Sequence, residues 1–277
     1  MPLEYHQVDV FSDRPFAGSP TMVYRLSHWL SDELLQRIAG EHNLSHTAFV
    51  VQEAAGWHLR CFTPLVEVSA AGNAALAAAH VLQLIYAEAA DRVDFISRAG
   101  VISVSREQGR LWLDLAAQYP DEEGVSLEVQ RALGVDIVDV LGANELFVVL
   151  ESEQALRGCR PDHAALAALM WLGVVITARG DQYDYVSRFF APRLGIAEGA
   201  ASAATHASLV PYWAKRLGKS SLRGYQCSRR GGALAGRLER NRVLVGAQVT
   251  LVASGRLLAG LGGESASASA PLPITSR

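Results

Sequence analysis

The feature that most constrains this chain is a run of very small residues that occurs twice, each time before a segment that predicts a helix. Residues 70–74 read AAGNA and lead into one alanine-rich segment, and residues 200–204 read AASAA and lead into another. The two runs occupy corresponding places in the two halves of the 277-residue chain. They therefore predict an internal repeat in which each half contains one central helix.

The segments around these helices predict β-structure. They are short, alternate apolar with polar residues, and are separated by turns that contain Gly or Pro; examples are EYHQVDVF, WHLRCFTP, GVISVSRE and GVVITARG. We expect an α+β fold of two similar lobes, residues 1–118 and residues 126–262. The polar stretch between them predicts a linker, and the low-complexity residues 263–277 predict a flexible tail.

Composition excludes several classes of protein. The net charge is -3 and the pI is about 6.2, so a nucleic-acid-binding function dominated by phosphate contacts is not expected. No apolar run reaches the ~18 residues of a membrane span, and the first residues do not resemble a signal peptide. Cys61, Cys159 and Cys227 are far apart and odd in number, which predicts reduced thiols in a cytoplasmic protein.

Helices that begin in tiny residues leave their first backbone N–H groups accessible. Two such helix ends that face one another would bind a small carboxylate between the lobes. The alternative is that small residues only allow close packing of a helix on its sheet. Spacing alone leaves both interpretations open.

Several ordered motifs carry a family resemblance: VDVFSDRPFAGSP, LSDELLQRIAGEHNLSHTAFV, FTPLVEVSAAGNAALAAAHVL, RFFAPRLGIAEG and PYWAKRLG. Together they resemble the PhzF-like family of phenazine biosynthesis, from about residue 4 to about residue 258. The resemblance implies the two-lobed fold of diaminopimelate epimerase, in which each lobe is a largely antiparallel mixed sheet around a central helix. It also implies a homodimer without metal or cofactor. The expected reaction is an isomerisation by proton movement in a small carboxylate-bearing molecule.

The positions that carry the family's chemistry differ here. His46 stands where the family has its proton-shuttling glutamate, and Asn73 stands where it has a histidine. Gly199 and Ala204 replace an aspartate and a serine. Ala71 replaces the cysteine of diaminopimelate epimerases, so racemisation by two cysteines is not supported.

His46 and Asn73 are the predicted catalytic residues. An imidazole can accept and return a proton near neutral pH, whereas the alternative role of His46 is to fill a polar hole. The Asn73 amide can orient a substrate but cannot transfer a proton; its alternative role is an N-cap. The predicted substrate-binding residues are Gly72, Ser19, Ser202, Ala203, Ala204 and Thr205.

Two further residues could assist. His206 would be a second proton carrier if it faced the site, but packing away from the site is the favoured alternative. Glu198 lies beside the missing aspartate and could substitute for it. Arg229 and Arg230 could add positive potential, although a solvated turn is their default role.

The resulting hypothesis is an isomerase of specialised, antibiotic-type metabolism. It would relocate a double bond in a small unsaturated amino-acid-like carboxylate, and a dihydropyrrole carboxylate has a suitable shape. The first alternative is a non-catalytic protein that binds a small anion. The second is a cyclase steered by the shape of its pocket.

Overall fold

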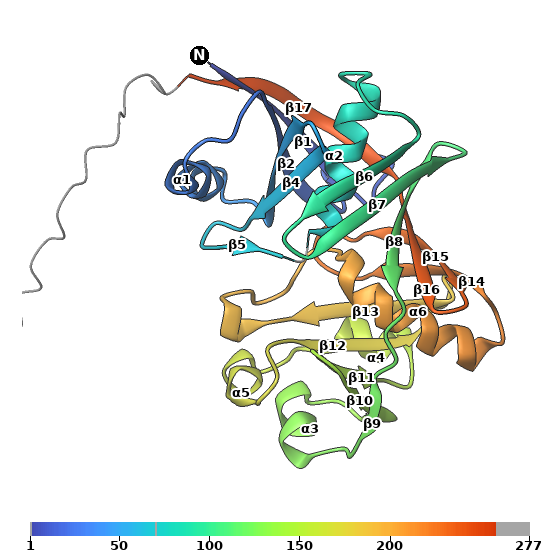
Figure 1. Cartoon of the computed structure of the whole chain (residues 1–277). Coiled ribbons are helices and arrows are strands. Elements are labelled where there is room, and N and C mark those ends of the chain that lie inside the picture. The colour runs from blue at the N-terminus through green and yellow to red at the C-terminus, as the bar shows by residue number, and fades with distance from the viewer. Residues whose placement is uncertain (1, 70, 259–277) are drawn as a thin grey trace, which may run out of the picture.

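The computed structural model describes residues 2–69 and 71–258, so the predicted tail lies outside the described residues. Two lobes are present, and each has a sheet of strands arranged around one central helix (Figure 1). Parallel and antiparallel strand pairs occur in both lobes. The predicted α+β class is therefore confirmed.

The first lobe places its sheet between two helices. α1 begins after Ser31, whose side chain accepts a hydrogen bond from the Leu34 N–H, as the sequence predicts. α2 is buried from Asn73 to Leu82 because its alanines allow the sheet to approach closely. The elements are β1 (Leu3–Val10), β2 (Ser19–Leu26), α1 (Asp32–His42), β3 (His46–Glu53), β4 (Gly56–Phe62), β5 (Glu67–Val68), α2 (Gly72–Leu84), β6 (Arg92–Ser97), β7 (Gly100–Glu107) and β8 (Arg110–Ala116).

The second lobe has α6 on one face of its sheet and three shorter helices on the other. Its elements are β9 (Asp121–Glu123), α3 (Leu127–Leu133), β10 (Asp139–Gly142), β11 (Leu146–Val149), α4 (Glu153–Gly158), α5 (His163–Ala168), β12 (Val174–Arg179), β13 (Tyr185–Phe190), the 3₁₀ helix η1 (Pro192–Leu194), α6 (Ala203–Leu217), β14 (Ser221–Gln226), β15 (Ala233–Glu239) and β16 (Arg242–Ala247).

The two lobes connect their strands and helices in the same way along the chain. In the first lobe the parallel neighbours β4 and β6 are connected through α2, and in the second lobe the parallel neighbours β13 and β14 are connected through α6. The parallel pairs β2–β3 and β11–β12 are likewise connected through helices. The internal repeat expected from the two small-residue runs is thus visible in the strand pairing.

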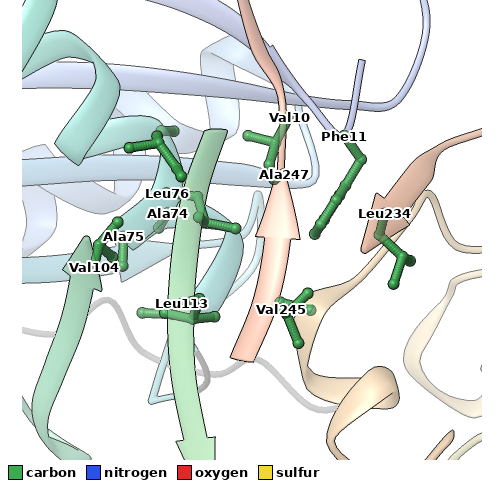
Figure 2. Close-up of a cluster of buried hydrophobic side chains, with 14 of the residues drawn as sticks. Val10, Phe11, Ala74, Ala75, Leu76, Val104, Leu113, Leu234, Val245 and Ala247 are labelled. Atoms are coloured by element: carbon green, nitrogen blue, oxygen red, sulfur yellow. The ribbon is translucent and has the colours of Figure 1, made fainter. Parts of the chain in front are cut away.

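One apolar cluster extends through both lobes. It contains Ala74 and Ala75 of α2, Leu113 of β8, and Leu234 and Val245 of the second lobe (Figure 2). The faces of the two sheets that point towards α2 and α6 contribute to this cluster. The opposite faces form two separate clusters, one with α1 and one with α3, α4 and α5.

Strands also cross between the lobes. β8 pairs with β16, and β17 (Val249–Leu257) pairs along the whole of β1. β17 lies within residues 126–262, the segment predicted for the second lobe, yet it completes the sheet of the first. The lobe boundaries themselves stay a prediction.

The expected linker differs from the structure at one point. Residues Asp121–Glu123 form β9, which pairs with β10. All three side chains are exposed, so the strand is held by backbone hydrogen bonds to its neighbour. An apolar pattern could not reveal such a strand, because none of its side chains enters the core.

Candidate functional site

The two central helices meet at their N-termini. A Cβ atom built on Gly72 would lie 3.2 Å from the Ala203 Cβ and 2.9 Å from Leu113 Cδ2. Larger residues at these positions would force the helix ends apart. The small residues therefore do serve close packing, both of α2 on β8 of its sheet and of one helix end on the other.

Asn73 connects the two helix ends. Its Nδ2 donates to Ser19 Oγ at 3.0 Å and to the Ala201 carbonyl at 2.8 Å, and its Oδ1 accepts from the Ala203 N–H at 2.9 Å. The residue that precedes α2 as its N-cap is Ala71. The N-cap alternative for Asn73 is therefore wrong for its own helix, because its amide satisfies the first N–H of α6 instead.

The two central helices differ from the others in how they begin. Side chains cap four helices, α1, α3, α4 and α5, through Ser31, Ser126, Ser152 and Asp162. In the described structure, the N-cap residues of α2 and α6 make no side-chain hydrogen bond to their helices. Neither helix has an acidic residue in its first turn. The positive ends of two helix dipoles therefore converge without a compensating carboxylate. Such a junction favours a bound anion.

His46 opens β3 on the side of the sheet that faces α2. Ala48 and Val50, which follow at alternate positions, belong to the same apolar cluster as α2. The ring is half-buried, and its Nδ1 is enclosed without a hydrogen-bond partner in the described part of the chain. Burial lowers the pKa of His46 to about 4. The imidazole is therefore neutral at neutral pH and can accept a proton.

Thr21 is a site residue that the sequence did not indicate. It is the register partner of His46 in the parallel pair β2–β3, so both side chains lie on the same face. Thr21 is fully buried, and within residues 2–69 and 71–258 its Oγ1 has no partner. Ser19, two residues earlier on the same strand, bonds to Asn73. His46, Thr21, Ser19 and Asn73 thus line one continuous strip.

On the other lobe, Gln226 organises the turn before α6. Its Nε2 donates to the carbonyls of Gly199 and Ala200, and its Oε1 accepts from the Ser202 N–H at 3.2 Å. Gln226 is fully buried at the end of β14. A polar residue at the third inward position of the strand, after Leu222 and Gly224, is the signal that could have identified it.

The remaining predicted binding residues are divided between the interior and the surface. Thr205 is buried, Ser202 is partly exposed and Ala204 is exposed. The N–H groups of Ser202 and Ala203 already bond to Gln226 and Asn73. A carboxylate that used Ala203 would therefore first have to displace Asn73.

The space of the missing aspartate is occupied by an aromatic ring. A Cβ atom on Gly199 would lie 2.7 Å from Phe189 Cδ1. The same ring lies 2.5 Å from the Cβ position of Gly173. Phe189 therefore packs between two glycines on the α6 side of the second sheet.

His206 and Glu198 have other roles here. His206 is fully buried, its Nδ1 is 2.9 Å from the Tyr185 hydroxyl, and burial lowers its pKa to about 3. Glu198 forms two hydrogen bonds with the Arg188 guanidinium, at 2.7 and 3.1 Å. Glu198 is therefore engaged by Arg188, whereas the Nε2 of His206 is enclosed without a partner among the described residues.

The loop that precedes Ser19 is held by hydrogen bonds from residues of both lobes. Buried Asp9 accepts a hydrogen bond from the Phe16 N–H at 2.7 Å and pairs with Arg230 at 2.8 Å. Arg230 also donates to the carbonyls of Gly18 and Ala17. A solvated turn is therefore the wrong description of Arg230. An open hollow here is lined by Arg14, Pro15, Phe16, Ala17, Arg229 and Arg230.

Two wider features complete the description. Among the described residues, no three His, Cys, Asp or Glu side chains are grouped as a metal site would require. No described helix has both the length and the apolar composition to cross a membrane.

The fold and this junction define the class of two-lobed, epimerase-like proteins. A predicted epimerase from Pseudomonas aeruginosa has this fold, with a TM-score of 0.70 at 20% identity over 92% of this chain and 99% of that chain. A crystal structure of a PhzF family protein from Enterococcus faecalis is more similar. Its TM-score is 0.90 at 40% identity, over 93% of this chain and 99% of that chain.

The model of the phenazine biosynthesis-like protein family matches residues 8–255. An uncharacterised isomerase of Pseudomonas aeruginosa is 58% identical over 258 residues, which cover 93% of this chain and 99% of that relative. The chain belongs to the phenazine biosynthesis-like (PhzF-like) family, whose similar bacterial members are named isomerases.

Proposed function

We propose that this isomerase-family protein relocates a double bond in a small, unsaturated, amino-acid-like carboxylate, with His46 as the group that moves the proton. The observation that carries the proposal is the position of His46. It lies on the α2-facing side of β3, in register with Thr21, and within the described residues neither its enclosed Nδ1 nor the Thr21 hydroxyl has a hydrogen-bond partner. A dihydropyrrole carboxylate is the substrate shape that we favour.

The substrate carboxylate would bind where the two helix dipoles converge. This binding would also activate His46, because a nearby negative charge raises the pKa of an imidazole. His46 starts with a pKa of about 4, at which its basicity is low. The bound anion would therefore strengthen the base at the moment when the base is needed. The imidazole then takes a proton from one carbon and returns it to another.

Further parts of the proposal come from the family and from composition. The protein would act as a cofactor-independent homodimer in the cytoplasm, in the biosynthesis of an antibiotic-type metabolite. No nucleic acid or membrane is needed as a partner.

The test is solvent exchange. The protein would be incubated in deuterated water with 1-pyrroline-2-carboxylate, and deuterium at the ring carbons would be followed by NMR and mass spectrometry. Removal of a general base lowers a rate by ~10²–10⁴-fold, so His46→Ala should lose exchange by a factor in this range. His28→Ala is the matched control, since His28 is exposed and far from the helix ends in sequence.

Three results would contradict the proposal. Exchange that survives His46→Ala unchanged would exclude His46 as the proton carrier. Thermal stabilisation by the compound without any exchange would support an anion-binding protein. A product with a new ring and no solvent deuterium would support a cyclase.

A further inference from the structure

Two buried polar atoms belong to neighbouring residues of the first lobe. Thr21 of β2 and His46 of β3 are opposite one another in a parallel pair, and paired strands lie only about 4.7–4.9 Å apart. Val23 and Ala48, two positions further along each strand, belong to the apolar cluster around α2, so Thr21 and His46 also point to that face. Among the described residues, neither the Thr21 hydroxyl nor the His46 Nδ1 has a hydrogen-bond partner. Buried polar atoms are nearly always paired, so two such atoms on adjacent residues require an explanation.

The two nitrogens of the His46 ring have different surroundings. Nδ1 is enclosed, whereas the ring as a whole is only half-buried, so Nε2 is the nitrogen that a substrate can reach. A neutral imidazole carries one hydrogen. Nε2 can therefore accept a proton only when that hydrogen is on Nδ1. The enclosed Nδ1–H group then needs an acceptor, both in the neutral ring and in the protonated ring that forms from it.

Other hydroxyl groups beside His46 are already engaged. Ser19, two positions before Thr21 on β2, accepts a hydrogen bond from Asn73 Nδ2 at 3.0 Å. Thr63 follows the last residue of β4, the other strand that pairs with β3. Its hydroxyl donates to a backbone carbonyl and accepts from two backbone N–H groups. In the part of the chain that the structure describes, Thr21 is thus the neighbour of His46 whose hydroxyl oxygen is still unpaired.

We propose that Thr21 is a positioning residue, whose hydroxyl oxygen accepts a hydrogen bond from the Nδ1–H of His46 and thereby keeps Nε2 available as the base. This inference rests on the proposed function, because it concerns the same histidine. The two atoms are not hydrogen-bonded in this structure. Hydrogen bonds of catalytic groups are often long before a substrate binds and shorten in the complex. A bond to the Nδ1–H also stabilises the ring once it is charged.

The first test determines which nitrogen of His46 carries the hydrogen, by nitrogen-15 NMR of histidine-labelled protein at pH 7.5. Burial lowers the pKa of His46 to about 4, so the ring is neutral at this pH. The signals of His46 are those missing from His46→Ala. Wild-type protein and Thr21→Ser, which keeps the hydroxyl, should carry the hydrogen on Nδ1. In Thr21→Val the enclosed Nδ1–H has no acceptor, so the hydrogen should move to Nε2.

Thr47 provides the matched control. It is fully buried, and its hydroxyl also lacks a partner within the described residues. Its side chain points to the opposite face of β3, with Phe49 and Val51. Thr47→Val should therefore leave the hydrogen on Nδ1. Neither valine variant should unfold at a lower temperature than wild type, because loss of an unpaired buried hydroxyl removes a desolvation cost.

The second test is the deuterium exchange of 1-pyrroline-2-carboxylate. A hydrogen bond to a charged group corresponds to a factor of about 10–100 in rate. Thr21→Val should therefore lower kcat by about this factor and leave KM unchanged. Thr21→Ser should restore most of the rate, and Thr47→Val should keep it.

Four results would overturn the proposal. They are a hydrogen on Nε2 of wild-type His46, the same hydrogen position in wild type and Thr21→Val, an unchanged kcat in Thr21→Val, and an equal loss of rate in Thr47→Val. A protein that shows the expected change of hydrogen position but exchanges no deuterium in any form would refute the proposed function and leave the hydrogen bond between Thr21 and His46 intact. The two failures are therefore distinguishable.

Discussion

Histidine shows how strongly the surroundings decide what one residue type does in this protein. His46 is half-buried at the start of β3, and its enclosed Nδ1 has no partner in the described residues. His206 is fully buried and bonds to Tyr185. Burial lowers the pKa of both, to about 4 and about 3. The first is the proton carrier of the proposed function, and the second adds a dependence of stability on pH.

The prediction for His206 concerns the free energy of unfolding. The ordinary pKa of histidine is about 6.5, so between about pH 6.5 and pH 3 the unfolded chain binds a proton at this residue and the folded chain does not. Stability is therefore lost as the pH falls through this range, by up to ~1.4 kcal/mol per pH unit. His206→Asn, which keeps a polar partner for Tyr185, should unfold in urea with a shallower pH dependence between pH 6 and pH 4.

Measurements at pH 8 provide the internal control for this prediction, because histidine is neutral there in both states. The difference between variant and wild type should then be constant with pH. An unchanged slope between pH 6 and pH 4 would show that His206 is protonated in the folded protein.

At the site, the sequence predicted positions better than partners. The resemblance selected His46, Ser19, Gly72, Asn73 and Ala203, and the structure brings the last four into contact. It could not show that both hydrogens of the Asn73 amide bond to protein groups. That depends on Ala201, which is 128 positions away.

Among the secondary-structure elements, the central helices were predictable and the short helices α3 and α4 were not. Residues that repeat every three or four positions, or long alanine runs, identify α1, α2 and α6. α3 and α4 have only seven and six residues, too few for a period to be read. Ser126 and Ser152, which cap them, were the available signals.

The connection between β13 and α6 leads to a prediction about stability. Gly199→Ala would place a methyl group 2.7 Å from Phe189 Cδ1. Overpacking of this kind destabilises a protein by about 1–3 kcal/mol, so the midpoint of urea unfolding should fall. Gly124→Ala is the matched control, since nothing lies within 4 Å of its Cβ position.

A smaller side chain in place of the Phe189 ring should relieve part of this loss of stability. In the double variant Gly199→Ala, Phe189→Leu, the loss should be less than the sum of the two single losses. Strict additivity of the two losses would indicate that the Phe189 ring moves away from an added methyl group at residue 199. The ring would then not be the reason why this position requires glycine.

For the whole molecule, the junction at Asn73 is a buried polar connection between the lobes. Asn73→Ala removes three hydrogen bonds and leaves the buried Ser19 hydroxyl and Ala203 N–H without these partners. We expect a loss of about 2–4 kcal/mol in the free energy of unfolding. Asn144→Ala, at an exposed residue, should leave stability within about 0.5 kcal/mol of wild type.

Hydrogen exchange would locate the effect. The N–H groups that begin α2 and α6 should lose protection in Asn73→Ala more than those of the sheets. Uniform loss of protection, or no loss of stability, would show that Asn73 does not hold the two helix ends together.

The pairing of β1 with β17 has a consequence for how the protein is made. Leu3 is opposite Leu257 in this pair, so one edge of β1 is without its neighbour until β17 has been synthesised. β2 covers only the other edge. Until then the nascent first lobe exposes an unpaired strand edge, and pairing of that edge with another chain is a hazard. The sheet of the first lobe closes in a late step that joins the two most distant strands of the described chain.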